Sequence, residues 1–208
     1  MRKKCLDKVY ELAKKNKKVV FIGSDLGPTT LSNFRKEFPD RFYMEGVTEA
    51  NIINMAVGLA IEGYIPYVNT IATFITRRCL EQIIVGIALH KLPIKLIGNG
   101  GGLVYAPLGP THLATDDISL LKPIPNISIV SVSDSDEMSL LMDQSLEYKN
   151  PLYIRLGKGY DPIVKYKSSF KIGKIRKATN TKDYSILLIS TGIMTKHVLD
   201  VSKLLEKH

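Results

Sequence analysis

Short, mostly apolar runs alternate with helical segments along this chain, and this alternation constrains its fold more than any other feature. The apolar runs lie at residues 19–23, 65–69, 93–98, 127–132 and 152–155. Helical periodicity marks residues 5–15, 48–62, 74–89, 116–121 and 134–146. Strands that are buried on both faces have solid apolar runs rather than a polar–apolar alternation. The sequence therefore predicts an α/β fold, in which a parallel sheet is flanked by helices.

The character of the chain changes after residue 157. Residues 157–182 are polar and rich in lysine, which is typical of a linker. A strand over 184–190 and a helix over 194–207 are expected after it, and one such pair cannot enclose a core alone. We therefore expect one domain over 1–160, a linker over 161–182, and over 183–208 the incomplete start of a further α/β domain.

Charge and cysteine content narrow the possible partners and the compartment. The chain carries a net charge of +9, but residues 1–20 carry +6, residues 165–208 carry +7 and the middle carries −4. Nucleic-acid binders usually carry a basic face on the working domain, so we do not expect nucleic acid as a partner. We do not expect a membrane partner either. Two cysteines far apart, Cys5 and Cys79, fit a reduced, cytoplasmic setting. The four histidines show no spacing typical of a metal site, so no metal ligand is assigned to this chain.

Candidate functional residues follow the strands, because ligands of open parallel sheets bind at the carboxyl ends of the strands. Glu49 precedes the most apolar helix of the chain, with Thr48 as a plausible N-cap. A carboxylate in a first helical turn is stabilised by the helix dipole. Position alone favours this purely structural role for Glu49. The apolar helix nevertheless makes Glu49 a candidate for burial. Burial raises the pKa of a carboxyl and would suit it to share a proton with a ring nitrogen.

Two further segments carry polar and aromatic groups. The loop after residue 98 holds four glycines and ends at Gly109-Pro110-Thr111-His112. Glycines let a backbone approach a ligand closely, but His112 alone is as consistent with a structural histidine as with a catalytic one. Phe74, Arg77 and Arg78 stand at a helix start, where the aromatic ring is equally consistent with a core position and the arginines with the surface.

Taken together, these segments resemble the pyrimidine-binding domain of the transketolase family, which has the thiamine diphosphate-binding fold. EGVTEAN at 45–51 resembles the family's glutamate-bearing helix, and TFITR at 73–77 resembles the segment after it. GPTH at 109–112 with DDI at 116–118 and IPN at 124–126 resembles a further stretch, and GSDL at 23–26 and PLYIR at 151–155 also fit. The motifs keep their order over about residues 5–165, and 184–208 resembles the start of the family's third domain.

The resemblance implies a role for each matching residue. Glu49 would be catalytic and would bind the cofactor, by a hydrogen bond to N1′ of the aminopyrimidine that favours removal of the C2 proton of the thiazolium. Phe74 would stack on the pyrimidine ring. Arg77 matches an arginine of the related deoxyxylulose-phosphate synthases and is assigned to the cofactor. His112 would exchange protons with substrate oxygens. Ser24, Asp25 and Lys158 would line the substrate channel.

Three positions depart from the family's pattern and concern the substrate. Leu108 stands where the family has an aspartate that contacts the donor, and Gly100 stands where transketolases have a histidine near the sugar phosphate. Lys158 stands where the family has the phosphate-binding arginine, so a phosphate there would meet a point charge without a bidentate fork. The substrate is therefore expected to differ from the usual pentose phosphates.

The sequence also lacks the family's Gly-Asp-Gly motif, which holds the diphosphate and Mg²⁺ on a separate domain. The resemblance therefore implies the C-terminal subunit of a split transketolase, a transferase that moves two-carbon ketol units between sugars. A partner subunit would hold the diphosphate and Mg²⁺ in a homodimer of heterodimers. The alternatives are a deoxyxylulose-phosphate-synthase-like or 2-keto acid dehydrogenase β-like subunit, and, in a different class, a catalytically idle scaffold. Retention of Glu49, Phe74 and His112 together argues against the scaffold.

Overall fold

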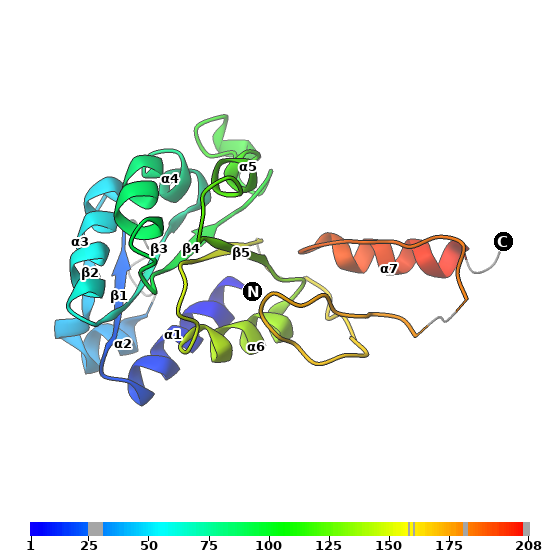
Figure 1. The fold of residues 1–208 in the computed structure, drawn as a ribbon, viewed down its shortest axis with the longest axis horizontal. Coiled ribbons are helices and arrows are strands. Elements are labelled where there is room, and N and C mark those ends of the chain that lie inside the picture. Colours follow the sequence, from blue (N-terminus) through cyan, green and yellow to red (C-terminus); the bar gives the residue numbers. More distant parts are fainter. Residues whose placement is uncertain (25–30, 158, 160, 181–182, 206–208) are drawn as a thin grey trace.

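The computed structural model describes residues 1–24, 31–157, 159, 161–180 and 183–205. Its centre is a parallel six-stranded sheet with the strand order β2-β1-β3-β4-β6-β5 (Figure 1). The strands are β1 (Val19–Gly23), β2 (Phe42–Met44), β3 (Ile65–Ile71), β4 (Lys95–Asn99), β5 (Ser128–Ser131) and β6 (Leu152–Leu156). The predicted fold class is confirmed. The order departs from chain order at β2-β1 and at β6-β5, and the parallel strands are joined by crossover connections.

Helices connect the strands and cover both faces of the sheet. They are α1 (Arg2–Lys15), α2 (Ser32–Glu37), α3 (Glu49–Ile61), α4 (Ala72–Thr76), α5 (Asp117–Leu121), α6 (Ser135–Ser145) and α7 (Met194–Leu205). A π-helix, η2, spans Gln82–Ala88, and short 3₁₀ turns span Pro39–Arg41 (η1) and Ala106–Leu108 (η3). In the part of the chain that the structure describes, no helix is both long and apolar enough to cross a bilayer.

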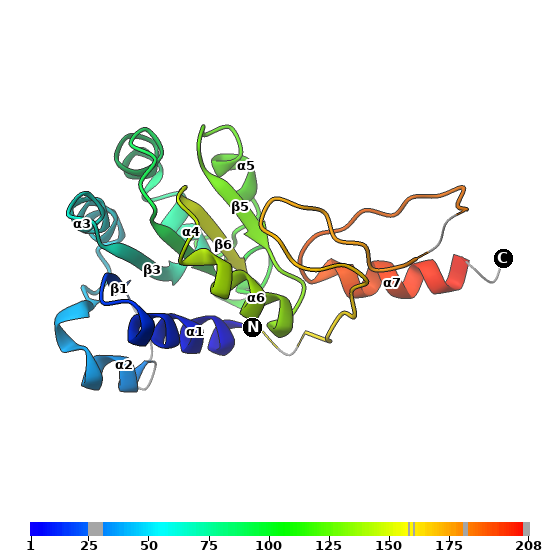
Figure 2. The same ribbon diagram turned by 60° about the horizontal axis from the view of Figure 1, so that its bottom comes forward.

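Each face of the sheet has its own hydrophobic core. Along β1, Phe21 packs with α1 and α6, whereas Ile22 packs with α3 and η2, because successive side chains of a strand point to opposite faces. The same division separates Tyr67 from Val68 in β3. Figure 2 shows α1 and α6 side by side below the sheet, and they are in contact. Because both faces of the sheet are covered, a site on the sheet itself would lie at the strand ends.

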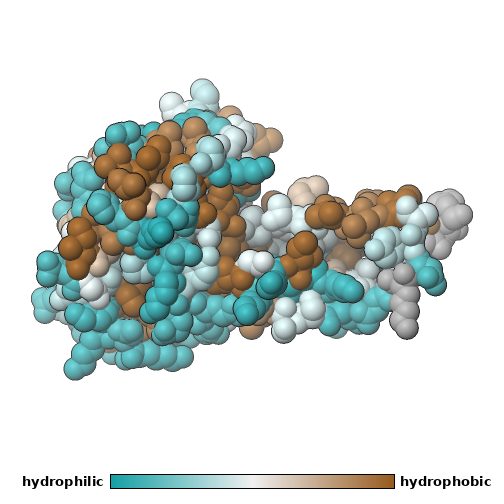
Figure 3. Space-filling view, viewed as in Figure 1, coloured by the Kyte–Doolittle hydropathy of each residue, from teal (hydrophilic) through white to brown (hydrophobic). Residues whose placement is uncertain are grey.

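The last part of the chain projects away from this α/β body. Residues 161–180 and 183–205, which include α7, form an arm beyond β5, and apolar side chains are exposed along it (Figure 3), among them Ile186, Leu187, Ile189 and Leu204. The strand expected over 184–190 is wrong, since no strand forms among the residues described there. A strand needs a hydrogen-bonded neighbour, and none of the described strands pairs with this segment. The expected helix is present as α7.

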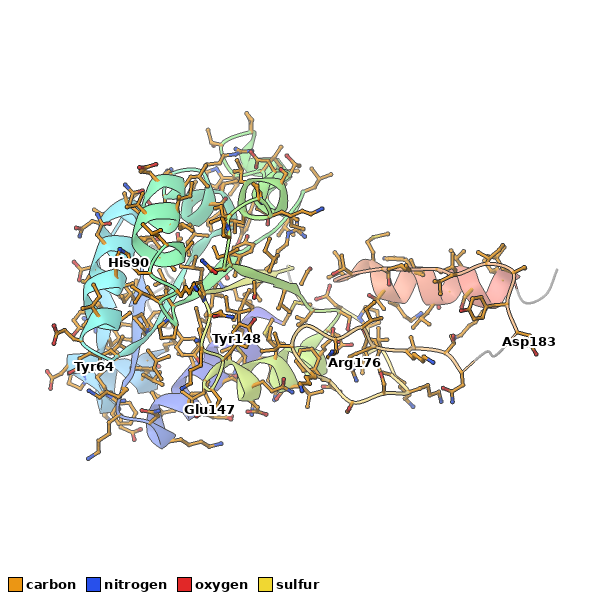
Figure 4. The ribbon with its side chains drawn as sticks, viewed as in Figure 1. Tyr64, His90, Glu147, Tyr148, Arg176 and Asp183 are labelled. Carbon is orange, nitrogen blue, oxygen red and sulfur yellow. The ribbon has the colours of Figure 1, made fainter. Side chains whose placement is uncertain are left out.

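Polar contacts fix the arm to the body. Asp134 accepts hydrogen bonds from the first turn of α6 and also from the Val164 backbone N–H, at 2.8 Å. Arg176, which Figure 4 labels, donates to Glu137 of α6 at 2.9 Å and lies over the Tyr166 ring. Gly192 donates from its backbone to the Ser131 carbonyl at the end of β5. Residues 161–180, which lie within the expected linker, therefore contact α6, and we call them the strap.

Candidate functional site

Glu49 is the first residue of α3, and its side chain is 3% exposed. The expected burial is confirmed. Thr48 holds the N-cap position, but its hydroxyl donates to the Glu45 carbonyl at 2.8 Å instead of accepting from the helix. The helix buries Ile52 and Ile53 immediately after Glu49, so its apolar face draws the carboxylate inward. The carboxylate therefore lies in a poorly hydrated place, where its interactions are stronger than at the surface.

Arg78 is the ionic partner of Glu49. Its Nη1 donates to Glu49 Oε2 at 2.8 Å, while its own side chain remains 45% exposed. Arg78 comes from the turn after α4, so the pair joins segments 29 residues apart. Both charges act on the thiol of the next residue, Cys79. Burial first, and then the Glu49 carboxylate, raise the pKa of the Cys79 thiol to about 12, whereas the Arg78 charge lowers it.

Phe74 lies between Arg78 and His112. The Arg78 guanidinium carbon is 3.8 Å from the centroid of the Phe74 ring. The rings of Phe74 and His112 are 5.1 Å apart between centroids and meet at 64°. Phe74 and His112 are both half-buried. The structure thus gathers four side chains from three segments in a continuous series, Glu49, Arg78, Phe74 and His112, and three of these four were candidates from sequence.

Arg77 faces a different partner from Arg78. Its Nε donates to both Asp116 oxygens, at 3.0 and 2.8 Å, and its Nη1 donates to the Pro110 carbonyl at 3.3 Å. The Arg77 guanidinium lowers the pKa of the Asp116 carboxyl through this hydrogen bond. Arg77 therefore ties the helix that carries Phe74 to the loop that carries His112. In this arrangement it holds the loop, and its assignment to the cofactor stays a prediction.

The remaining candidates are placed less directly. Ser24 is buried after β1, and its hydroxyl donates to Thr70 Oγ1 at 2.5 Å. Asp25 and Lys158 lie outside the described residues. Leu108 is exposed, and a Cβ at Gly100 would overlap the ring of Tyr105, which takes the space of any side chain there. Of the three departures from the family's pattern, the two among the described residues are therefore an exposed apolar residue and a tyrosine-filled position.

A second ionic group supports the glycine loop from behind, and sequence reasoning missed it. Asp117 is 1% exposed, accepts from Tyr153 Oη at 2.9 Å and pairs with Arg155 Nε at 2.7 Å. Arg155 packs so closely that a Cβ at Gly101 would lie 2.5 Å from its guanidinium carbon. Asp117 Oδ1 has no partner among the described residues. The sequence signal was present, since Asp117 and Arg155 both lie in the motifs that fit the family.

The model of the family "transketolase, pyrimidine binding domain" matches residues 1–160. This chain belongs to the transketolase family. A putative transketolase family protein of Sinorhizobium fredii is 35% identical to this transketolase-family chain over 95% of its length and 57% of that protein. A 1-deoxy-D-xylulose-5-phosphate synthase of Clostridium perfringens is 35% identical over 93% of this chain and 31% of that protein. A putative transketolase C-terminal section of Methanocaldococcus jannaschii is 31% identical over all of this chain and 66% of that protein.

The fold agrees with a solved structure of the same family. A structure described as a split gene transketolase, an inactive β4 tetramer, matches this transketolase-family chain with a TM-score of 0.88 and 31% identity. The match covers 99% of this chain and 66% of that one. The chain therefore spans between about a third and two thirds of the length of these relatives. The series from Glu49 to His112 lies within the residues that the family model matches.

Proposed function

We propose that this chain supplies the pyrimidine-binding half of a thiamine diphosphate site and transfers two-carbon ketol units between sugars. It does so as the C-terminal subunit of a split transketolase, with a partner that holds the diphosphate and Mg²⁺. One observation supports this most strongly: a buried carboxylate, an aromatic ring and a histidine adjoin one another within the domain that the family model matches. Membership of the family implies the use of thiamine diphosphate.

The residues present fit the pyrimidine part of that cofactor. A planar cation, the Arg78 guanidinium, already lies over Phe74 and bonds to Glu49, so a flat group with a hydrogen-bond donor suits this place. Glu49 shares the proton at N1′ of the bound aminopyrimidine and so fixes its tautomer. Phe74 orients the ring by stacking. His112 exchanges protons with the substrate oxygens. The cofactor, when bound, supplies a thiazolium that accepts the electrons of the broken carbon–carbon bond.

The proposal of a partner rests on the relatives. Relatives of similar coverage are described as a transketolase C-terminal section and as a split gene transketolase. The latter is described as an inactive tetramer of β chains, and we likewise propose that this chain is inactive without a partner. The donor, the acceptor and the cytoplasmic location of the enzyme remain part of the proposal.

The proposal is tested with the chain alone and together with a diphosphate-binding transketolase subunit. We expect ketol transfer from ketose phosphates only with the partner, thiamine diphosphate and Mg²⁺ present. Glu49→Gln keeps the shape of the side chain but removes its acid, so we expect a loss of about 10²-fold or more in kcat. Glu45→Gln is the matched control, since Glu45 is exposed in the same segment. Full turnover without partner, or unchanged turnover of Glu49→Gln, would contradict the proposal.

A second candidate function is a deoxyxylulose-phosphate-synthase-like reaction. It is favoured by the 35% identity to the Clostridium perfringens synthase and by Arg77. Pyruvate would then replace the ketose phosphate as donor. Offering both donors to the same complex separates the two functions.

A further inference from the structure

The Arg78 side chain contacts the same two groups that the proposed cofactor needs. Its Nη1 bonds to Glu49 Oε2 at 2.8 Å, and its guanidinium carbon lies 3.8 Å from the centroid of Phe74. Glu49 is buried, but Arg78 is 45% exposed and extends from solvent into the site. The guanidinium can therefore leave for water by side-chain rotation, without moving the buried carboxylate or the core beneath it.

A guanidinium and an aminopyrimidine present similar chemistry to this site. Both are flat, both stack on an aromatic ring, and both can donate a hydrogen bond to a carboxylate. The geometry points to Arg78 as an internal placeholder for the aminopyrimidine: it fills the site while the site is empty and must leave when the cofactor binds. Arg78 thereby sets the affinity of the site. This inference rests on the proposed function, because it takes Glu49 and Phe74 as the pyrimidine site.

The placeholder also has a stabilising role in the empty chain. Removing one partner of a buried ion pair leaves an uncompensated charge, which destabilises the fold. Without Arg78, Glu49 would be such a charge. The empty chain therefore gains stability from the same contact that a ligand must displace, and the affinity for the ligand falls by the strength of that contact.

Thiamine titrated into the full-length chain tests this without the partner, since thiamine carries the aminopyrimidine but no phosphate. We expect Arg78→Met to bind thiamine about tenfold more tightly than wild type, a difference of about 1.4 kcal/mol. Arg78→Met should also lower the Tm of the empty chain. Arg78→Lys keeps a cation but loses the planar group, so its affinity should lie between the two. Arg35→Met, on an exposed arginine of α2, is the control and should match wild type.

Two further variants separate the failure of this inference from the failure of the proposed function. Glu49→Gln should weaken thiamine binding, and the double variant Glu49→Gln/Arg78→Met should regain the Tm that Arg78→Met loses. If Glu49→Gln weakens binding but Arg78→Met binds equally, more weakly or not at all up to millimolar thiamine, Arg78 is no placeholder and the proposed function stands. If Glu49→Gln binds thiamine as wild type does, both fall.

Discussion

Lys95 is a fully buried lysine at the start of β4, and the proposed reaction does not use it. Its ammonium group donates to the Pro93 carbonyl at 2.8 Å and to the Tyr148 carbonyl at 2.7 Å (Figure 4 labels Tyr148). Burial, and next the charge of Lys149, lower the pKa of Lys95 to about 7. The lysine therefore titrates in the fold far below its range in the unfolded chain.

This lowered pKa predicts a stability that rises with pH. Between about pH 7 and pH 10 the unfolded chain holds the Lys95 proton and the folded chain does not, so the free energy of unfolding increases with pH, by at most ~5 kcal/mol. Urea unfolding of wild type and Lys95→Met from pH 6 to 8.5 measures it. The variant should show the flatter dependence, and the exposed Lys122→Met should follow wild type. Parallel curves for wild type and Lys95→Met would contradict the assignment.

The sequence predicts single residues of the site to different extents. The burial of Glu49 could be predicted, because an acid that begins an apolar helix is drawn inward with it. Its pairing with Arg78 could not, since the partner lies in the turn after α4 and its exposed side chain resembles any surface arginine. The periodicity of the sequence predicts the face of a helix or strand on which a residue lies. It does not predict a contact between two elements, because that contact depends on how the elements pack.

At the scale of elements, replacement by alanine should change the stability of the chain in opposite directions at two glycines. A Cβ at Gly101 would meet Arg155, which holds Asp117 behind the glycine loop, so Gly101→Ala should destabilise the chain by ~1–3 kcal/mol. Gly58 lies within α3 with open space around it, so Gly58→Ala should stabilise the chain by ~0.5–1 kcal/mol. Urea unfolding of both variants checks the signs. If the two variants changed the free energy of unfolding equally, the glycine loop would be able to accommodate the added Cβ, and Arg155 would not fix its position.

Most long elements could be predicted, whereas short elements and unpartnered ones could not. The continuous helix predicted over 74–89 is wrong, since a turn after Thr76 separates α4 from η2. The strand predicted over 19–23 matches β1, and the helix predicted over 48–62 differs from α3 by one residue at each end. The strand β2 has three residues at the edge of the sheet and no fully buried side chain, so its apolar run is too short to be recognised as a strand. Residues 184–190 show the converse, because an apolar run becomes a strand only beside another strand.

At the scale of the whole molecule, the contact between the strap and α6 should protect the strap from proteolysis. Arg176 and Glu137 are almost buried, at 12% and 10% exposure, and their ion pair joins the strap to α6. Glu137→Gln weakens this pair and removes no lysine or arginine, so trypsin should cut within residues 165–177 several-fold faster than in wild type. Glu147→Gln, on an exposed residue just beyond α6, is the control. Equal cutting of Glu137→Gln and wild type would mean that other contacts hold the strap.

The organisation of the whole chain was harder to predict than its core. Composition indicated a linker over 161–182, because lysine-rich polar segments rarely form a core. The contacts of Asp134, Glu137 and Gln144 with this stretch involve backbone groups and one guanidinium, and they leave no apolar signature in the sequence. Whether 161–182 links two domains and 183–208 begins another therefore stays a prediction.

The central claim, that Glu49 acts on N1′ of a bound aminopyrimidine, is tested most directly by exchange of the C2 proton of thiamine diphosphate for deuterium. Proton NMR measures this rate in the complex with a diphosphate-binding subunit, for wild type, Glu49→Gln and Glu45→Gln. We expect exchange at least about 10²-fold slower for Glu49→Gln than for wild type at equal cofactor occupancy, and no change for Glu45→Gln. Equal exchange rates in wild type and Glu49→Gln would contradict this claim.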